Sequence, residues 1–223
     1  MEIYLKPTEA VDFNYAAIQE TSKKLTLGCT NDVEKTIKLF HFVRDSIQYN
    51  MYMVSMHLDD YKASTTLMRG KGYCVQKAVL LAALGRAAHI PSKLAFAKIE
   101  NHKMPAHLME QFGAAISPRH GYNQFYLHEK WVSVAATFDK KLCQRNGLCT
   151  VEFDGVHDAV LPETDLAGNP YIEYLEKYEP QADLPLEWIT KEISKIWGME
   201  KRAWLSEGDS KGHETPFSKI SNI

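Results

Sequence analysis

Apolar residues recur at helical intervals in the first part of the chain. They predict one helix before residue 26, with Val11, Tyr15, Ile18 and Leu25 at helical spacing. A second helix is expected to begin at Asn31, which can cap its first turn, and Glu34 three residues later can reach back toward the same turn. The apolar face of this second helix would be formed by Val33, Ile37, Phe40, Val43 and Ile47.

The segment after Cys74 has a different pattern. Gly70 and Gly72 punctuate a turn, and the next residues read VQKAVLLAALGRAAHIP. A helix that is apolar almost all round is a buried one. We therefore expect a central helix that starts near Cys74 and stops before Pro91.

Beyond residue 92 the helical spacing of apolar residues ends, and successive residues instead alternate between two faces, as in a strand. A short strand is predicted around Leu94–Ala97, followed by a long loop over 100–119, of a length that is often functional. Residues 120–127 and 131–137 predict two strands joined by a tight turn at His128-Glu129, which together form an antiparallel hairpin.

The remaining segments complete an α+β arrangement. The chain order predicts an irregular aromatic wall over 49–61, a short helical turn over 139–145 and an acidic loop over 151–168 that could cap a cleft. An amphipathic helix is expected over 186–205, its inward residues being Trp188, Ile189, Ile193, Ile196 and Trp197. We expect one domain over 1–205, with its core at about 30–145, and a flexible tail over 206–223.

Composition narrows the classes of partner. The 223 residues carry 26 Lys and Arg against 28 Asp and Glu, and this balance argues against a nucleic-acid partner. The longest apolar stretch, 78–84, is too short to cross a bilayer, and the first residues lack a secretory signal. The sequence therefore predicts a cytoplasmic protein with no membrane partner and with reduced cysteines; its oligomeric state stays open.

Of the four cysteines, Cys74 has the setting of a nucleophile. Backbone N–H groups are unpaired at the first turn of a helix, so they stabilise a thiolate and lower the pKa of the thiol. The same groups can hold an oxyanion during acyl transfer. The commonest role of a buried cysteine is structural, and that alternative stays open on this feature alone.

A nucleophilic cysteine needs a base, usually a histidine. His120 opens a strand after the long loop, where its ring can face a cleft while the strand stays rigid. A solvent-facing loop histidine is the alternative. His41, His89 and His128 lie within a helix, at a helix end and in a turn, and are weaker candidates.

Three segments of the sequence resemble the transglutaminase-like superfamily of papain-fold cysteine enzymes. Gly72-Tyr73-Cys74 with the helix that ends in His89-Ile90-Pro91-Ser92-Lys93 is similar to that family's "Gly-x-Cys … Gly-Ile-Pro-Ala-Arg" block. His120-Gly-Tyr-Asn-Gln-Phe resembles its "His-Ala-Trp-Asn-Glu-Val" strand, and Lys130-Trp-Val-Ser-Val with Thr137 its "Gly-Trp-x-x-Val-Asp-x-Thr" strand. The order and spacing of the three blocks, over about 30–145, make the resemblance specific.

The resemblance implies a papain-like, transglutaminase-core fold: a central buried helix packed on an antiparallel sheet, with extra N- and C-terminal helices. It also implies a triad in which Cys74 is the nucleophile and His120 the general base and acid. The family's aspartate falls on Ala135 here, so we expect Asp139 to replace it. Four extended residues span about 13 Å, so this requires a bulge or turn near Ala136-Thr137. A helix N-cap is the alternative role of Asp139.

Three further side chains are expected to line the site, namely Tyr73, Gln76 and Trp131. No cofactor is expected. Cys143 and Cys149 lack the spacing of a zinc site, and the acidic run after Glu152 lacks the glycine and final Glu of a calcium loop.

These features predict a cysteine-dependent acyl-transfer enzyme that acts on a peptide or on a small amide or ester. Hydrolysis, as a peptidase or amidase, is the simplest outcome because water is always present. Transfer to an amine, as an acyltransferase or transamidase, is the first alternative, and an arylamine-type acetyl transfer a weaker one. A non-catalytic binding module on the same fold is the alternative from another class, and the Ala135 departure favours it.

Overall fold

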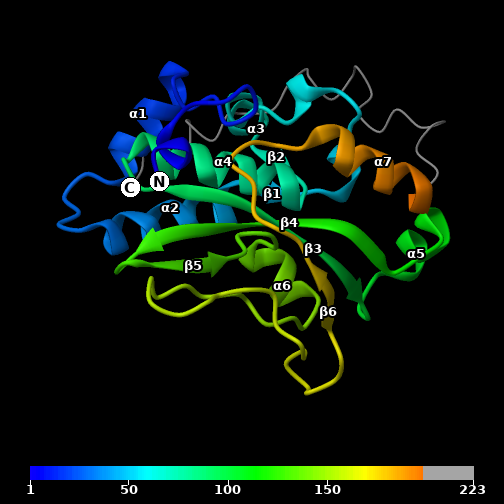
Figure 1. Cartoon of the computed structure of the whole chain (residues 1–223). Helices are drawn as coiled ribbons and strands as arrows, with labels where there is room; N and C mark the ends of the chain where they lie inside the picture. The colour runs from blue at the N-terminus through cyan, green and yellow to red at the C-terminus, as the bar shows by residue number, and fades with distance from the viewer. Residues whose placement is uncertain (198–223) are drawn as a thin grey trace.

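A computed structural model describes residues 1–197, apart from the side chains of residues 111, 112, 196 and 197. It has the expected α+β architecture, in which helices pack on a curled antiparallel sheet (Figure 1). The predicted tail over 206–223 lies outside the described residues, and the single-domain organisation stays a prediction.

The N-terminal helices follow the predicted pattern with shorter bounds. Helix α1 spans Ala16–Leu25, so two of the residues expected in it, the buried Val11 and the exposed Tyr15, precede it. Helix α2 spans Asp32–Ser46 and is capped by Asn31, whose side chain accepts a hydrogen bond from the Glu34 N–H. Between α2 and the central helix lie α3 (Ala63–Arg69) and two single turns of 3₁₀ helix, Met51–Met53 and Leu58–Asp60; another, Glu2–Leu5, opens the chain.

The central helix α4 spans Cys74–Ala87 and is buried on every side, as its sequence predicts. Gly85 allows close contact with the sheet, since a Cβ there would lie 2.4 Å from Cε1 of Phe125. The buried Lys77 is satisfied by the carbonyls of Arg44 and Ile47, so it holds the end of α2 against α4. The guanidinium of Arg86 likewise donates to three carbonyls, those of Lys6, Ser92 and Ala182.

The main sheet has the strand order β5-β4-β3-β6 and is antiparallel throughout. Its strands are β3 (Ser92–Asn101), β4 (Ile116–Leu127), β5 (Lys130–Val134) and β6 (Ile172–Lys177). The predicted hairpin is present, and both turn residues, His128 and Glu129, have positive φ, as a tight primed turn requires. Strand β6, which pairs with the outer edge of β3, has no counterpart in the sequence-based prediction.

Two predicted segments have different bounds in the structure. The expected loop over 100–119 contains the ends of β3 and β4 and a helix, α5 (Ala106–Phe112). The strand expected over 131–137 ends at Val134, because the chain leaves β4 there and the Ala135 N–H donates to the carbonyl of Ala159.

Each face of the sheet carries its own apolar cluster. Helices α1–α4 and α7 (Leu186–Trp197) lie on one face, and α6 (Lys140–Arg145) lies with the irregular segment before β6 on the other (Figure 1). Ile189 and Ile193 of α7 are buried, as predicted, and Trp188 packs against Phe96. The predictions for the side chains of residues 196 and 197, and for the helix beyond them, lie outside the described residues.

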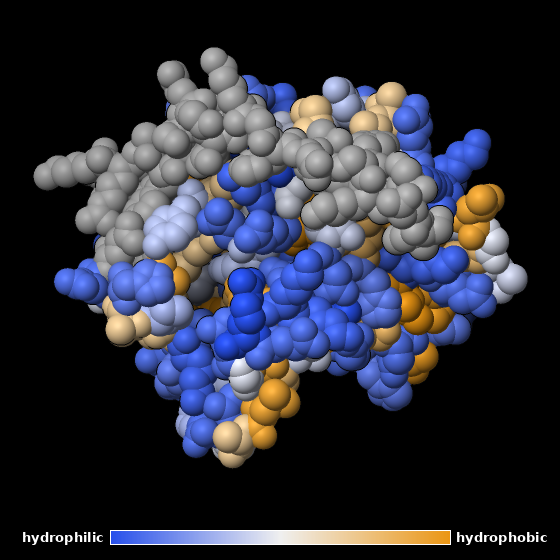
Figure 2. Space-filling model, turned by 180° about the vertical axis from the view of Figure 1, so that it is seen from behind, coloured by the Kyte–Doolittle hydropathy of each residue, from blue (hydrophilic) through white to orange (hydrophobic). Residues whose placement is uncertain are grey.

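Most of the surface in Figure 2 is hydrophilic, with small, separate hydrophobic areas outside the grey atoms. Within residues 1–197, no helix has both the length and the apolar character that crossing a membrane would need.

Candidate active site

Cys74 is the first residue of α4, and local pairing fixes this position. Just before it, β2 (Lys71–Gly72) pairs in parallel with β1 (Gln48–Tyr49). The side chain of Gln76 accepts from the Tyr73 N–H, and its amide donates to the carbonyls of Met53 and Asp60. Gln76 therefore holds the turn that delivers Cys74 to the start of the helix.

Burial, rather than the helix start, dominates the state of the Cys74 thiol. It raises the pKa of the thiol to about 11, against hydrogen bonds from the N–H groups of Gly121, Val75 and Cys74 itself, which lower it. The expectation of a lowered pKa is therefore wrong for the resting protein, because desolvation of the thiolate outweighs the favourable N–H groups.

Gly121 permits the close approach of β4 to the start of α4. A Cβ at this position would lie 2.8 Å from Cα of Val75, closer than real contacts allow. The glycine thus lets an N–H group of β4 reach the Cys74 sulfur in addition to the N–H groups of the helix start.

His120 precedes this glycine on β4 and is almost completely buried. Its ring stacks on Tyr122 with centroids 6.1 Å apart, and Nε2 has no hydrogen-bond partner among the described residues. Burial lowers the pKa of His120 to about 3. The imidazole is therefore neutral at pH 7, and the same burial makes its protonated form unfavourable.

Asp139 has the alternative role that the sequence allowed. It caps α6, where its two carboxylate oxygens accept from the N–H groups of Leu142 and Tyr49, at 2.9 and 3.2 Å. Within the described residues no hydrogen bond joins this carboxylate to His120, so its expected role in orienting His120 stays a prediction. Ala135, where the family aspartate falls, lies in the apolar cluster with Tyr122 and leaves His120 without a carboxylate from that position.

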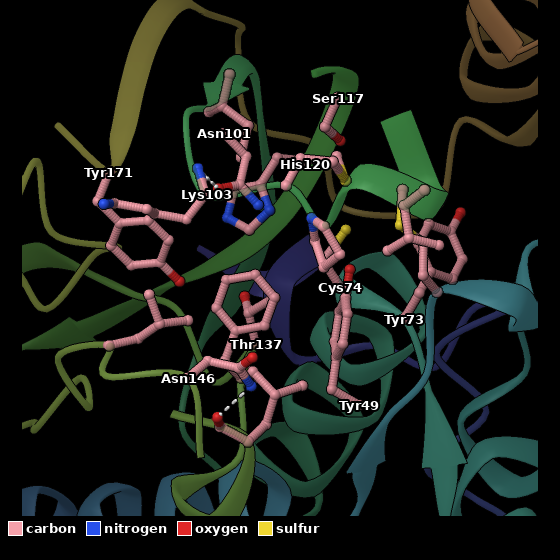
Figure 3. A pocket seen from close by; sticks show the side chains of 18 residues that line it. Tyr49, Tyr73, Cys74, Asn101, Lys103, Ser117, His120, Thr137, Asn146 and Tyr171 are labelled. Atoms are coloured by element: carbon pink, nitrogen blue, oxygen red, sulfur yellow. Dashed lines mark hydrogen bonds between the residues drawn. The ribbon is translucent and has the colours of Figure 1, made fainter. Parts of the chain in front are cut away.

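A cavity of about 260 Å³ opens beside Cys74 and His120. Figure 3 shows both residues on this cavity, Cys74 from α4 and His120 from β4. Its other lining residues are Tyr49, Met51, Tyr73, Ile99, Asn101, Lys103, Met104, Pro105, Leu108, Ser117, Thr137, Phe138, Leu142, Asn146, Leu148 and Tyr171.

The three further residues that sequence analysis placed at the site differ in location. Tyr73 lines the cavity, and its hydroxyl donates to that of Tyr61 at 2.9 Å. Gln76 does not line the cavity; it is committed to the turn before α4. Trp131 is also absent from the described lining, because it packs against Tyr4 and Tyr126 and lies under the ammonium group of Lys93.

Most of the cavity wall was not identified as site residues from the sequence. The aromatic segment after residue 48 and the long loop after β3 do supply much of it, as their composition and length suggested. Phe138, Leu142 and Leu148 around α6, and Tyr171 before β6, lack a local signal because only the tertiary fold brings them to Cys74. An ion pair of 2.8 Å between Lys103 and Asp165 joins two of the surrounding loops.

One side-chain group outside the cavity has the composition of a metal site. Ligand atoms of Glu100, His102 and Glu173 lie within 4.8 Å of one another, but the group is exposed or half-exposed, and His102 Nε2 already lies 3.3 Å from the Glu173 carboxylate. Such groups are common without an ion, so this one is not assigned as a site.

Among known proteins, two solved structures are similar to this one in fold. One is described as a candidate cysteine protease from Cytophaga hutchinsonii, at 15% identity and a TM-score of 0.48, with 80% of this chain and 53% of that chain covered. The other is described as a candidate protease from Parabacteroides distasonis, at 16% identity and a TM-score of 0.40, with 58% and 26% covered. This chain thus spans about half of the first and a quarter of the second.

No curated protein gives a significant match. The model of the transglutaminase-like superfamily matches residues 19–136, which include Cys74, His120 and just over half of the chain. The chain therefore belongs to the transglutaminase-like superfamily.

Proposed function

We propose that the protein is a cysteine-dependent acyl-transfer enzyme that hydrolyses an amide or ester, as a peptidase or amidase. The observation that carries the proposal is the shared cavity. The Cys74 thiol, at a helix start with three backbone N–H groups around its sulfur, lines the same cavity as the neutral imidazole of His120. These are the parts that nucleophilic acyl transfer needs.

The protonation states favour a concerted first step. Cys74 starts as a thiol and His120 as a neutral ring, so His120 takes the thiol proton as sulfur attacks the carbonyl carbon. The N–H groups at the start of α4 stabilise the oxyanion that forms. His120 then returns the proton to the leaving amine or alcohol as its bond to carbon breaks, and a thioester remains on Cys74.

Water resolves the thioester. His120 removes a proton from the water molecule that attacks the thioester carbon, the C–S bond breaks, and the proton returns to the Cys74 sulfur. An amine in place of water would give transfer instead, which is the alternative outcome of the same chemistry.

The second candidate is a binding module without catalysis. Ala135 and the partnerless Nε2 of His120 favour it, because within residues 1–197 no carboxylate accepts a hydrogen bond from Nε2 to orient the imidazole or stabilise its protonated form. The two candidates differ in whether a covalent acyl-enzyme can form.

Acylation by a p-nitrophenyl ester, followed by intact-mass and peptide mass spectrometry, tests the proposal. We expect an acyl adduct on Cys74, its disappearance in Cys74→Ala, and slower formation in His120→Ala. Cys149 and Cys29 are half-buried thiols in the same chain and serve as internal controls. The proposal fails if Cys74 is not acylated, or if His120→Ala leaves its acylation rate unchanged.

A further inference from the structure

The wall of the cavity beside Cys74 is mainly apolar. Of the described side chains that line it, eleven are aliphatic, aromatic, Met or Pro and the rest are polar. Lys103 is the only cationic one among these, because His120 is neutral, and no carboxylate is among them. The Lys103 ammonium already lies 2.8 Å from Asp165. A charged substrate group placed here would lose its hydration without gaining an unpaired counter-charge, which is strongly unfavourable.

Three aromatic rings form one continuous part of this wall. Phe138 meets Tyr49 edge to face, with centroids 4.7 Å apart, and Tyr171 in a more parallel arrangement at 6.4 Å. Tyr49 and Tyr171 come from segments far apart in the chain, and Figure 3 shows them around the same cavity as Cys74. Rings fixed in this way offer both faces and edges to an aromatic guest.

The size of the cavity agrees with such a guest. An apolar cavity of about 150 Å³ holds a benzene molecule. The volume of about 260 Å³ beside Cys74 leaves room for one aromatic ring and for the atoms that join it to a reacting carbonyl.

We propose that this cavity is the acyl-group subsite, and that it selects an uncharged aromatic side chain on the carbonyl side of the bond that is cleaved. This inference rests on the proposed function. The acyl part stays bonded to Cys74 while the amine or alcohol departs, so the enclosed part of the site suits the acyl part.

Three p-nitrophenyl esters provide the test: acetate, phenylacetate and hydrogen glutarate, whose acyl groups are small, aromatic and negatively charged. Each rate of Cys74 acylation is divided by the rate of free cysteine with the same ester, which removes differences in intrinsic reactivity. We expect phenylacetate to exceed acetate by at least about tenfold, since differences of one to a few carbon groups in a fitted pocket have effects of this size. Glutarate should fall below acetate.

A matched pair of variants locates the effect. Leu108 lines the cavity from α5, whereas Leu166 is 70% exposed and does not line it. Leu108→Trp should fill the cavity and remove the phenylacetate preference while acetate still reacts; Leu166→Trp should keep the preference. Phe138→Leu, which preserves an apolar wall but removes the central ring, should reduce the preference and serves if Leu108→Trp does not fold.

The outcomes separate the two proposals. Equal normalised rates for the three esters, with Cys74 acylated and turned over, would overturn the subsite and leave the enzyme intact. Retention of the phenylacetate preference in both Leu108→Trp and Phe138→Leu would also overturn it. Absence of acylation on Cys74 by every ester would overturn the proposed function itself.

Discussion

The pH dependence of Cys74 alkylation distinguishes a neutral Cys74–His120 pair from a preformed thiolate–imidazolium pair. The perturbation is pH alone, applied to the free protein. In a preformed pair the sulfur is already ionised at pH 7, so its reaction with iodoacetamide is nearly independent of pH between the two pKa values. In a neutral pair the rate follows the small thiolate fraction.

The structure supplies the magnitude. With a pKa of about 11, only about one Cys74 in ten thousand is ionised at pH 7. Against a thiol at the ordinary value of 9.0, this is a difference of about 100-fold in thiolate fraction. We therefore expect Cys74 to react about 100-fold more slowly at pH 7 than an unperturbed thiol, with a tenfold rise for each pH unit up to about pH 10.

The assay is a pulse of iodoacetamide at each pH, with peptide mass spectrometry to separate Cys74 from the other three cysteines. A peptide of sequence GYCVQ, which carries residues 72–76 without the fold, is the matched reference. His120→Ala is the second control and should leave the pH slope unchanged, because in a neutral pair the imidazole holds no thiol proton.

A plateau in the Cys74 rate between about pH 4 and pH 8, lost in His120→Ala, would refute the reasoning. It would mean that the three N–H groups and His120 together outweigh the desolvation of the thiolate.

Three further predictions concern the same residues. The pKa of His120 is lowered from 6.5 to about 3, so the unfolded chain binds a proton first, and the free energy of unfolding falls by about 1 kcal/mol per pH unit as the pH decreases through this window. In urea titrations between pH 7 and 4, His120→Gln should reduce this pH dependence of stability. An unchanged pH dependence would contradict the prediction. Ala135→Asp should supply the missing carboxylate and raise the pKa of His120 by about 1–3 units in an NMR titration, whereas the neutral Ala135→Asn should not. Gly121→Ala forces a Cβ toward the backbone of Val75, so we expect a loss of about 1–3 kcal/mol in the free energy of unfolding together with slower acylation; wild-type stability and rate would show that β4 can move without consequence.

Local sequence signals predicted much of the scaffold. The cap at Asn31, the all-apolar segment after Cys74 and the turn at His128-Glu129 each depend on neighbouring residues, and each appears in the structure. Cys74 and His120 could be paired in advance because their blocks resemble one family. Cys74 does begin α4 as expected, whereas His120 lies inside β4, which starts earlier, at Ile116.

The rest depends on long-range packing. Val134 ends β5 because the chain turns there to pair with Ala159, and the residues around Val134 contain no pattern that predicts this turn. The position of Asp139 as the cap of α6 likewise depends on where the chain turns after Val134. The raised pKa of Cys74 also follows from how deeply the fold buries the thiol. The sequence indicated only the helix start, whose N–H groups lower the pKa.

Strand β6 brings the chain back to β3 after residue 171, and this has a consequence for which part of the sequence forms the cavity. The superfamily match ends at residue 136, yet Phe138, Leu142, Leu148 and Tyr171 all come after it and are part of the cavity wall. Cys74 and His120, the proposed nucleophile and base, thus lie within the residues that match the superfamily, whereas a later segment, which ends in β6, supplies these four residues of the cavity wall. We expect substitutions within 137–171 to change which acyl group is preferred while Cys74 and His120 keep their positions.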